Sequence, residues 1–228
     1  MPASVQDPAA PPLATTPLPA KLANLLACPG EVFEEVAAAP ARARNWLVPT
    51  LLVALASIVL AAALTSKNQA AAVGQIIEAG KAETLPARWQ MLSAMTITLA
   101  AFAGTGWSAL VLWLIGRVFL NARFSYWKAV EVAGLTGSIV ALGAVVTALL
   151  VAASGDVAAR PALSLLASGL PADNPVRAVL GVLNVFHLWT TAVLAIGLSK
   201  LSGVSFKEAA FWVFGYWLVF RLALILLC

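Results

Sequence analysis

The sequence predicts an all-α membrane protein, a polytopic helical bundle with five transmembrane helices. Five apolar runs carry this prediction, and they occupy residues 47–65, 92–116, 130–152, 178–199 and 209–227. A helix needs ~17 to 25 residues to cross a hydrocarbon core of ~30 Å, and each run is long enough. Because lipid offers no hydrogen-bond partner to free backbone groups, the runs must be helices, and the alternation typical of membrane strands is absent from them.

The composition also indicates a membrane protein and leaves no water-soluble domain. Hydrophobic residues make up 61% of the chain and charged residues only 11%, whereas soluble domains are about 25% charged. The formal charge is +4, but the basic residues lie scattered between the apolar runs and form no stripe. The lipid bilayer is therefore the expected partner, and nucleic acid is not.

Three segments are expected along the chain. Residues 1–20 form a Pro/Ala-rich tail with few bulky apolar side chains, which predicts disorder. Residues 21–46 show a helical period broken at Pro29-Gly30, which predicts two short interfacial helices on the cytoplasmic face. An interfacial anchor is favoured for them over a partner-docking segment. Residues 47–228 form the transmembrane domain.

Basic residues in the loops predict a cytoplasmic N-terminus and a C-terminus outside. The two tight connections, 117–128 and 200–208, are both basic, and such loops favour the cytoplasm. The alanine-rich composition also indicates a bacterial source, so the expected location is the bacterial inner membrane. Cys28 and Cys228 then lie on opposite sides, so they are not expected to pair. The inner side would hold Lys21, Arg42, Arg44, Arg117, Arg123, Lys128, Lys200 and Lys207, and the outer side Lys67, Lys81, Arg88, Arg160 and Arg177.

One helical hairpin recurs about eighty residues later in the sequence. A pattern of aromatic, small and basic positions over 107–130 returns over 189–210, which predicts a parallel repeat of spans 2–3 in spans 4–5. Ser205 and Glu208 form a capping box before the last helix, and Ser125 takes the matching place before the third.

Small residues recur every fourth position on two spans. Such stripes mark close helix contacts in lipid, because small side chains let two backbones approach. Contacts within one bundle are favoured here over a dimer face, and a homo-oligomer is the alternative. The stripes are Thr96, Ala100, Gly104 and Ser108 on the second span and Ala129, Ala133, Gly137 and Ala141 on the third.

Four polar residues within the apolar runs form the candidate polar site: Asn184, His187, Arg221 and Glu131. Asn184 and His187 are spaced i, i+3, so they are expected to share a helix face as a proton or solute site or, preferably, as an interhelical hydrogen-bonding pair. Arg221 is expected to snorkel toward the outer surface. Glu131 follows Lys128 by three residues, which predicts an ion pair at the inner mouth of the third span.

No catalytic residue, cofactor-binding residue or metal ligand is expected from this sequence. His187 is the lone histidine, and it has no cysteine or aspartate near it in the sequence with which to bind a metal. Paired carboxylates and a Ser-His set are also lacking, so an enzyme is not expected.

Short motifs spread over residues 22–228 resemble a known family. They are Cys28-Pro29-Gly30-Glu31-Val32-Phe33, Pro40, Trp46-Leu47-Val48-Pro49, Asn184-Val185-Phe186-His187-Leu188-Trp189, Ala195-Ile196-Gly197-Leu198 and Leu201-Ser202-Gly203-Val204-Ser205. In this order they resemble the bacterial branch of the Yip (Ypt-interacting protein) domain family. The resemblance implies five spans, a cytoplasmic N-terminus and a role in organising membranes.

The expected function is that of a non-enzymatic Yip-type membrane protein that organises membrane or recruits a protein partner. The alternative is a transporter of a small solute or lipid that uses the polar cluster near the outer side of spans 4 and 5.

Overall fold

The computed structural model describes residues 16–76, 87–167 and 183–227, together with residues 169, 174, 176, 180 and 181. Within these residues, two short helices precede five long ones, and a 3-10 helix, η1, follows the third long helix. The bounds are α1 (Leu18–Ala27), α2 (Pro29–Ala38), α3 (Arg44–Ile76), α4 (Ala87–Val118), α5 (Tyr126–Ser154), η1 (Leu163–Ala167), α7 (Val185–Ser202) and α8 (Phe206–Leu227). Over these described residues the chain is helical and forms no strand, as the predicted fold class requires, and only Ala162 and Asn184 form an isolated β-bridge.

Four of the five long helices have the length and apolar composition of a membrane span. They are the segments Arg44–Ser66, Arg88–Val118, Tyr126–Ser154 and Val185–Ser202. The fifth, α8, carries Lys207, Glu208 and Arg221 within 206–223, the part whose side chains are described. These charges set α8 apart from the other four.

The helix ends differ from the predicted runs. α3, α4 and α5 all extend beyond their apolar runs at both ends, because polar residues can continue a helix into the interface. The fourth run was expected to start at 178, but α7 starts at Val185 because Asn184 caps it. The predicted tail also ends early, since α1 begins at Leu18, and residues 1–15 lie outside the described residues.

The predicted break between the two short helices is confirmed. α1 ends at Ala27, Pro29 is the first residue of α2, and Pro40 follows the end of α2. Proline suits the first turn of a helix because that turn leaves its N–H groups unpaired.

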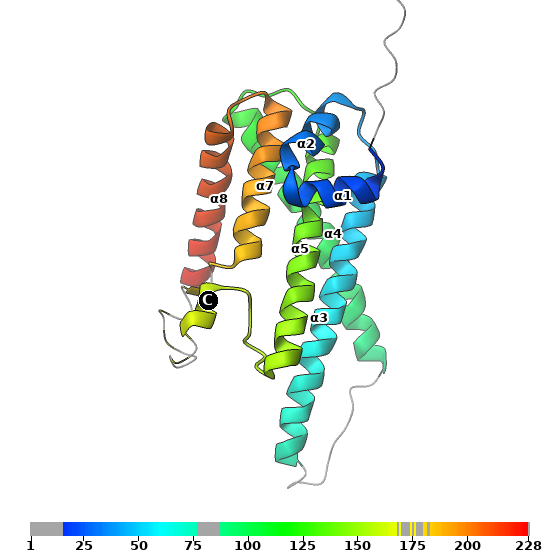
Figure 1. The fold of residues 1–228 in the computed structure, drawn as a ribbon, viewed down its shortest axis with the longest axis vertical. Helices are drawn as coiled ribbons and strands as arrows, with labels where there is room; N and C mark the ends of the chain where they lie inside the picture. The colour runs from blue at the N-terminus through cyan, green and yellow to red at the C-terminus, as the bar shows by residue number, and fades with distance from the viewer. Residues whose placement is uncertain are drawn as a thin grey trace, which may run out of the picture.

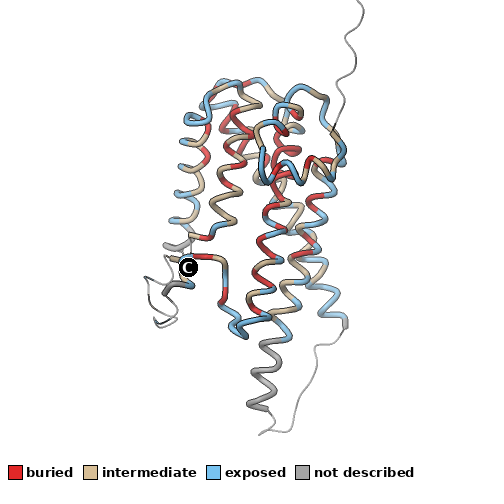
Figure 2. The backbone as a smooth tube through the Cα atoms, in the orientation of Figure 1, coloured by how far each residue is buried: buried red, intermediate tan, exposed pale blue. Residues whose placement is uncertain are grey.

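α5 lies at the centre of the bundle and packs against α3, α4 and α7 (Figure 1). Its buried residues run along most of its length, whereas α8 is largely exposed (Figure 2). α3 approaches α5 closely, because a Cβ added to Gly134 would collide with the Cα atom of Trp46. Within the stripe of small residues predicted on the third span, Gly137 also faces α3, because an added Cβ there would lie 3.2 Å from Val53 Cγ2.

The two hairpin connections, 119–125 and 203–205, lie at the end of the bundle that also carries α1 and α2 (Figure 1). α8 runs from this end of the bundle toward the opposite one. Ser125 is the N-cap residue of α5, yet its side chain makes no capping bond. Ser205 does cap α8, since its Oγ atom accepts a hydrogen bond from Glu208 N–H over 3.3 Å.

Helices α1 and α2 each bury apolar side chains in the protein core. Phe33 is 0% exposed and joins Leu25, Val32 and Val36 in one apolar cluster with residues of α5 and α7. α7 provides the space through Gly197, where an added Cβ would lie 3.4 Å from the Phe33 ring and would collide with Val132. The two helices, here called the cap (18–38), are thus docked onto the end of the bundle.

Candidate functional site

The structure divides the candidate polar site between the two ends of the bundle. Glu131 lies in the first turns of α5, at the end that carries the cap. His187 lies in the first turn of α7, at the opposite end, where Arg221 contacts it. The four residues therefore form two sites.

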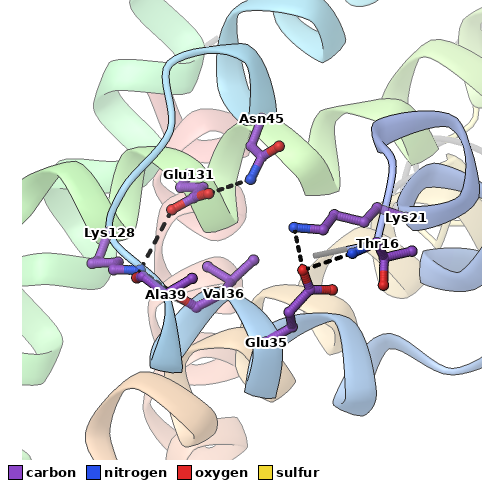
Figure 3. A network of polar contacts seen from close by, with 8 residues as sticks. All are labelled: Thr16, Lys21, Glu35, Val36, Ala39, Asn45, Lys128 and Glu131. Carbon is purple, nitrogen blue, oxygen red and sulfur yellow. Dashed lines mark hydrogen bonds and ion pairs between the residues drawn. The ribbon is translucent and has the colours of Figure 1, made fainter. Parts of the chain in front are cut away.

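At the cap end, Glu131 is buried in a polar network that joins three helices (Figure 3). Its Oε1 atom accepts a hydrogen bond from Asn45 Nδ2, at the start of α3, and its Oε2 atom lies 3.7 Å from Lys128 Nζ. Glu131 and Asn45 are 1% and 2% exposed. The predicted ion pair between Lys128 and Glu131 is confirmed, and Asn45 is a further partner that sequence reasoning missed.

Lys128 ties this network to the cap. Its ammonium group donates hydrogen bonds to the backbone carbonyls of Val36 and Ala39, at the end of α2 (Figure 3). The last carbonyls of a helix have no partner within the helix, and a cation there also favours the helix dipole. Lys128 therefore both neutralises Glu131 and fastens α2 to α5.

A second ion pair holds the two cap helices together. Lys21 Nζ of α1 lies 3.0 Å from Glu35 Oε1 of α2, and the same oxygen accepts a hydrogen bond from Thr16 N–H over 3.1 Å. Burial alone would raise the pKa of Glu35, but the hydrogen bonds from Lys21 and Thr16 and the charge of Lys21 outweigh it. The pKa of Glu35 is therefore lowered.

At the opposite end, Asn184 acts as the N-cap of α7. Its Oδ1 atom accepts hydrogen bonds from the N–H groups of Phe186 at 2.9 Å and His187 at 3.4 Å. Asn184 thus precedes the helix. Its i, i+3 spacing had predicted that it shares a helix face with His187, and this prediction is wrong. The side chain satisfies backbone donors that a helix N-terminus otherwise leaves unpaired.

His187 and Arg221 contact one another across α7 and α8. Arg221 Nη2 lies 2.9 Å from His187 Nδ1. Because a guanidinium can only donate, His187 Nδ1 accepts, and the ring proton of a neutral His187 then lies on Nε2. Arg221 also lies over the ring of Trp217, 6.0 Å from its centre. The arginine was expected to snorkel toward the outer surface, and in the structure its guanidinium contacts the first turn of α7 through His187.

Two adjoining cavities surround this pair. One, of about 220 Å³, lies between α4, α5, α7 and α8 and includes Arg221 in its wall. The other, of about 240 Å³, lies between α3, α5, α7 and the loop after α5, and Arg160 lines it. His187, Thr190 and Val140 line both cavities. Arg160 and Thr190 are site residues that sequence reasoning missed.

A third cavity, of about 420 Å³, lies beside the small residues of α4. Ala100, Gly104 and Ser108 line it, and a Cβ added to Gly104 would meet nothing within 4 Å. The stripe on the second span was expected to mark a close helix contact. It borders open space instead, while α5 makes its close approach to α3 at Gly134.

No group of three metal-binding side chains occurs among the His, Cys, Asp and Glu residues that the structure describes. Cys28 is exposed as a free thiol in the cap, and Cys228 lies outside the described residues. Both sites offer hydrogen bonds and charge. At the cap end the polar groups are buried against one another, whereas at the opposite end they lie beside cavities.

Comparison with known proteins finds matches over most of the chain. The chain is 28% identical over 217 residues to "Membrane protein YknW" of Bacillus subtilis (strain 168), and the match covers 88% of each chain. No solved structure matches the fold. The model of the Yip1 domain family matches residues 23–227, which include α2 and all five long helices. The chain therefore belongs to the Yip1 domain family of membrane proteins.

Proposed function

We propose that the protein is a non-enzymatic organiser of the inner membrane that recruits a protein partner through its cap. In this proposal α8 crosses the bilayer as the fifth span, the N-terminus is cytoplasmic, and the two hairpins are copies of one repeat. The observation that carries the proposal is the attachment of the cap to α5 through Lys128.

The attachment matters because it makes the cap a fixed surface on the bundle. Phe33 anchors α2 in the core, Lys128 holds the C-terminal end of α2, and Lys200 of α7 forms an ion pair with Glu34. A preorganised surface loses little conformational freedom when a partner binds. The outward positions of the cap are exposed and include Asn24, Cys28, Glu31, Ala37 and Ala38.

Charge supports placing this end in the cytoplasm. Arg44, Arg117, Arg123 and Lys207 are exposed at or beside the cap-end connections. They form no ion pair in the part of the chain that the structure describes. Exposed cations next to spans favour the cytoplasmic face, where they meet anionic lipid.

Transport, the alternative function, receives less support from the geometry. It would use Asn184, His187 and Arg221 near the outer side of spans 4 and 5. His187 and Arg221 do contact each other beside the cavities, but the side chain of Asn184 is engaged as the N-cap of α7.

Photo-crosslinking in native membranes tests the proposal. A photo-reactive residue at Ala37, on the cap, should give a discrete crosslinked protein adduct, and one at Val157, exposed at the opposite end, should not give that adduct. The double substitution Asn24→Arg/Glu31→Arg should abolish the adduct, because both residues lie on the proposed contact surface. Equal adducts from both positions, or an adduct that survives the double substitution, would refute partner recruitment through the cap.

A further inference from the structure

The walls of the two adjoining cavities carry positive charge. Arg160 and Arg221 line the two adjoining cavities, and no aspartate or glutamate lines either one. Neither arginine takes part in an ion pair within the described chain. Asp156 lies on the same loop as Arg160, and its Oδ1 atom accepts the N–H of Ala158 over 2.8 Å. Arg160 is exposed, but Arg221 is partly buried, where a cation is costly unless an anion accompanies it.

The side chains around these cavities also have unused hydrogen-bond donors. Arg221 has five N–H groups, and His187 Nδ1 accepts only one of them. His187 has a further donor at Nε2 when Nδ1 accepts. The hydroxyl of Thr190 is buried without a partner among the described residues, and Thr190 lines both cavities. Donors from three residues thus surround a common space.

The rest of the cavity beside Arg221 is apolar. Its wall includes Trp107, Leu112, Val213 and Phe220, which come from α4 and α8. Trp107 Nε1 donates to the hydroxyl of Tyr216 over 2.8 Å and thereby joins these two helices along the cavity. A cationic end beside an apolar wall is complementary to a molecule with an anionic head and a hydrocarbon tail.

We propose that Arg160, His187, Thr190 and Arg221 bind a phosphate group, as carried by a membrane lipid headgroup or by free phosphate. Arginine suits this role because its planar fork can donate two parallel hydrogen bonds to one phosphate. The apolar wall favours the lipid as the source. This site is independent of the proposed recruitment through the cap, because it lies at the other end of the bundle.

Native mass spectrometry of the full-length protein in detergent tests this site. The probes are phosphatidylglycerol, a galactosyl diacylglycerol with the same acyl chains but no phosphate, and inorganic phosphate. We expect retention of phosphatidylglycerol and at least tenfold weaker retention of the galactolipid. If inorganic phosphate displaces phosphatidylglycerol, the site accepts the free anion as well; if it does not, the lipid is the specific ligand.

Substitutions locate the binding. Arg160→Gln/Arg221→Gln should weaken phosphatidylglycerol binding at least tenfold, and Arg221→Lys should retain part of it. Arg117→Gln is a matched control, because Arg117 also lies over a tryptophan four residues earlier, Trp113, but at the cap end. Arg160 is exposed, so Arg160→Gln alone folds and should still weaken binding. Equal binding of both lipids, or unchanged binding in Arg160→Gln/Arg221→Gln, would overturn the proposal.

Discussion

Asn45 donates a hydrogen bond from its side-chain amide to the carboxylate of Glu131, a residue 86 positions away in the sequence. This bond connects the start of α3 with the first turns of α5, and Lys128 extends the connection to the end of α2. One buried carboxylate therefore lies in a network that links the cap to two long helices. A charge that is removed from water in this way stabilises the fold only as long as all its partners are present.

Glu131→Ala should strongly destabilise the protein. The substitution leaves Lys128 and Asn45 without their buried partner, and loss of one member of a buried pair costs ~3 to 5 kcal/mol. Thermal unfolding in detergent should show a clear fall in Tm. Glu208→Ala is the control, because Glu208 is exposed at the start of α8; a similar fall in both variants would contradict the role assigned to Glu131.

Gly134→Ala and Gly104→Ala should have opposite effects, although both place a methyl group on a long helix. At Gly134 the methyl collides with Trp46 of α3, so the helices must separate, and overpacking of this kind costs ~1 to 3 kcal/mol. At Gly104 the methyl meets nothing within 4 Å, and alanine favours a helix over glycine by up to ~1 kcal/mol. The free energy of unfolding of the two variants, measured in the same detergent, checks the difference.

The helices were well predicted because lipid offers backbone N–H and C=O groups no hydrogen-bond partner outside the helix. Runs of apolar residues must bond internally, so the presence of each long helix followed from hydropathy alone. The ends were less predictable, since α3 already starts at the charged Arg44. The break at Pro29 was predictable because proline restricts the backbone locally.

The candidate sites were predictable only where the partners are neighbours in the sequence. The pair of Lys128 and Glu131 followed from its i, i+3 spacing, whereas Asn45 belongs to the same network through packing that no local pattern encodes. Asn184 was misplaced although its signal was present, because asparagine before an apolar run is a common N-cap. The contact of His187 with Arg221 could not be predicted from local sequence, because it depends on how α7 and α8 face each other.

Acid should loosen the cap by protonating Glu35. Because the pKa of Glu35 is lowered from the usual 4.5 in the folded protein, its ionised form stabilises the fold above that value. This stabilisation is lost as the pH falls from about 4.5 through the lowered pKa of the folded state. A fluorophore on Cys28, in a Cys228→Ser background, should lose anisotropy over this range.

Two substitutions separate Glu35 from Glu31, an exposed acid of the same cap helix. Glu35→Gln should lose the acid-dependent step, since no carboxylate remains to titrate beside Lys21. Glu31→Gln should retain it, because Glu31 is exposed and has no hydrogen bond or ion pair to the residues described around it. A step of equal size in Glu35→Gln would assign the transition to another group.

Phe33→Ala should undock the cap without unfolding the long helices. Phe33 is fully buried against α7, and truncating a buried phenylalanine costs ~3 to 5 kcal/mol. Hydrogen exchange should rise at residues 18–38 and stay low in α5. Leu26→Ala is the control, because Leu26 is 41% exposed on the same cap; unchanged protection of the cap in Phe33→Ala would show that the polar contacts alone hold it in place.

Cys28 provides a direct test of orientation. Its thiol is exposed in the cap, which lies at the same end of the bundle as the connections 119–125 and 203–205. Basic residues lie in or beside these connections, namely Arg117, Arg123, Lys200 and Lys207. If these basic segments set the orientation, the cap faces the cytoplasm. A membrane-impermeant maleimide should therefore label Cys28 in inside-out vesicles and not in intact spheroplasts, again in a Cys228→Ser background.

In a second variant, Val157→Cys with both native cysteines replaced by serine, the pattern should reverse, because Val157 is exposed beyond the far end of α5. Labelling of Cys28 from outside intact cells would invert the proposed topology and place the cavities beside Arg160 and Arg221 on the cytoplasmic side.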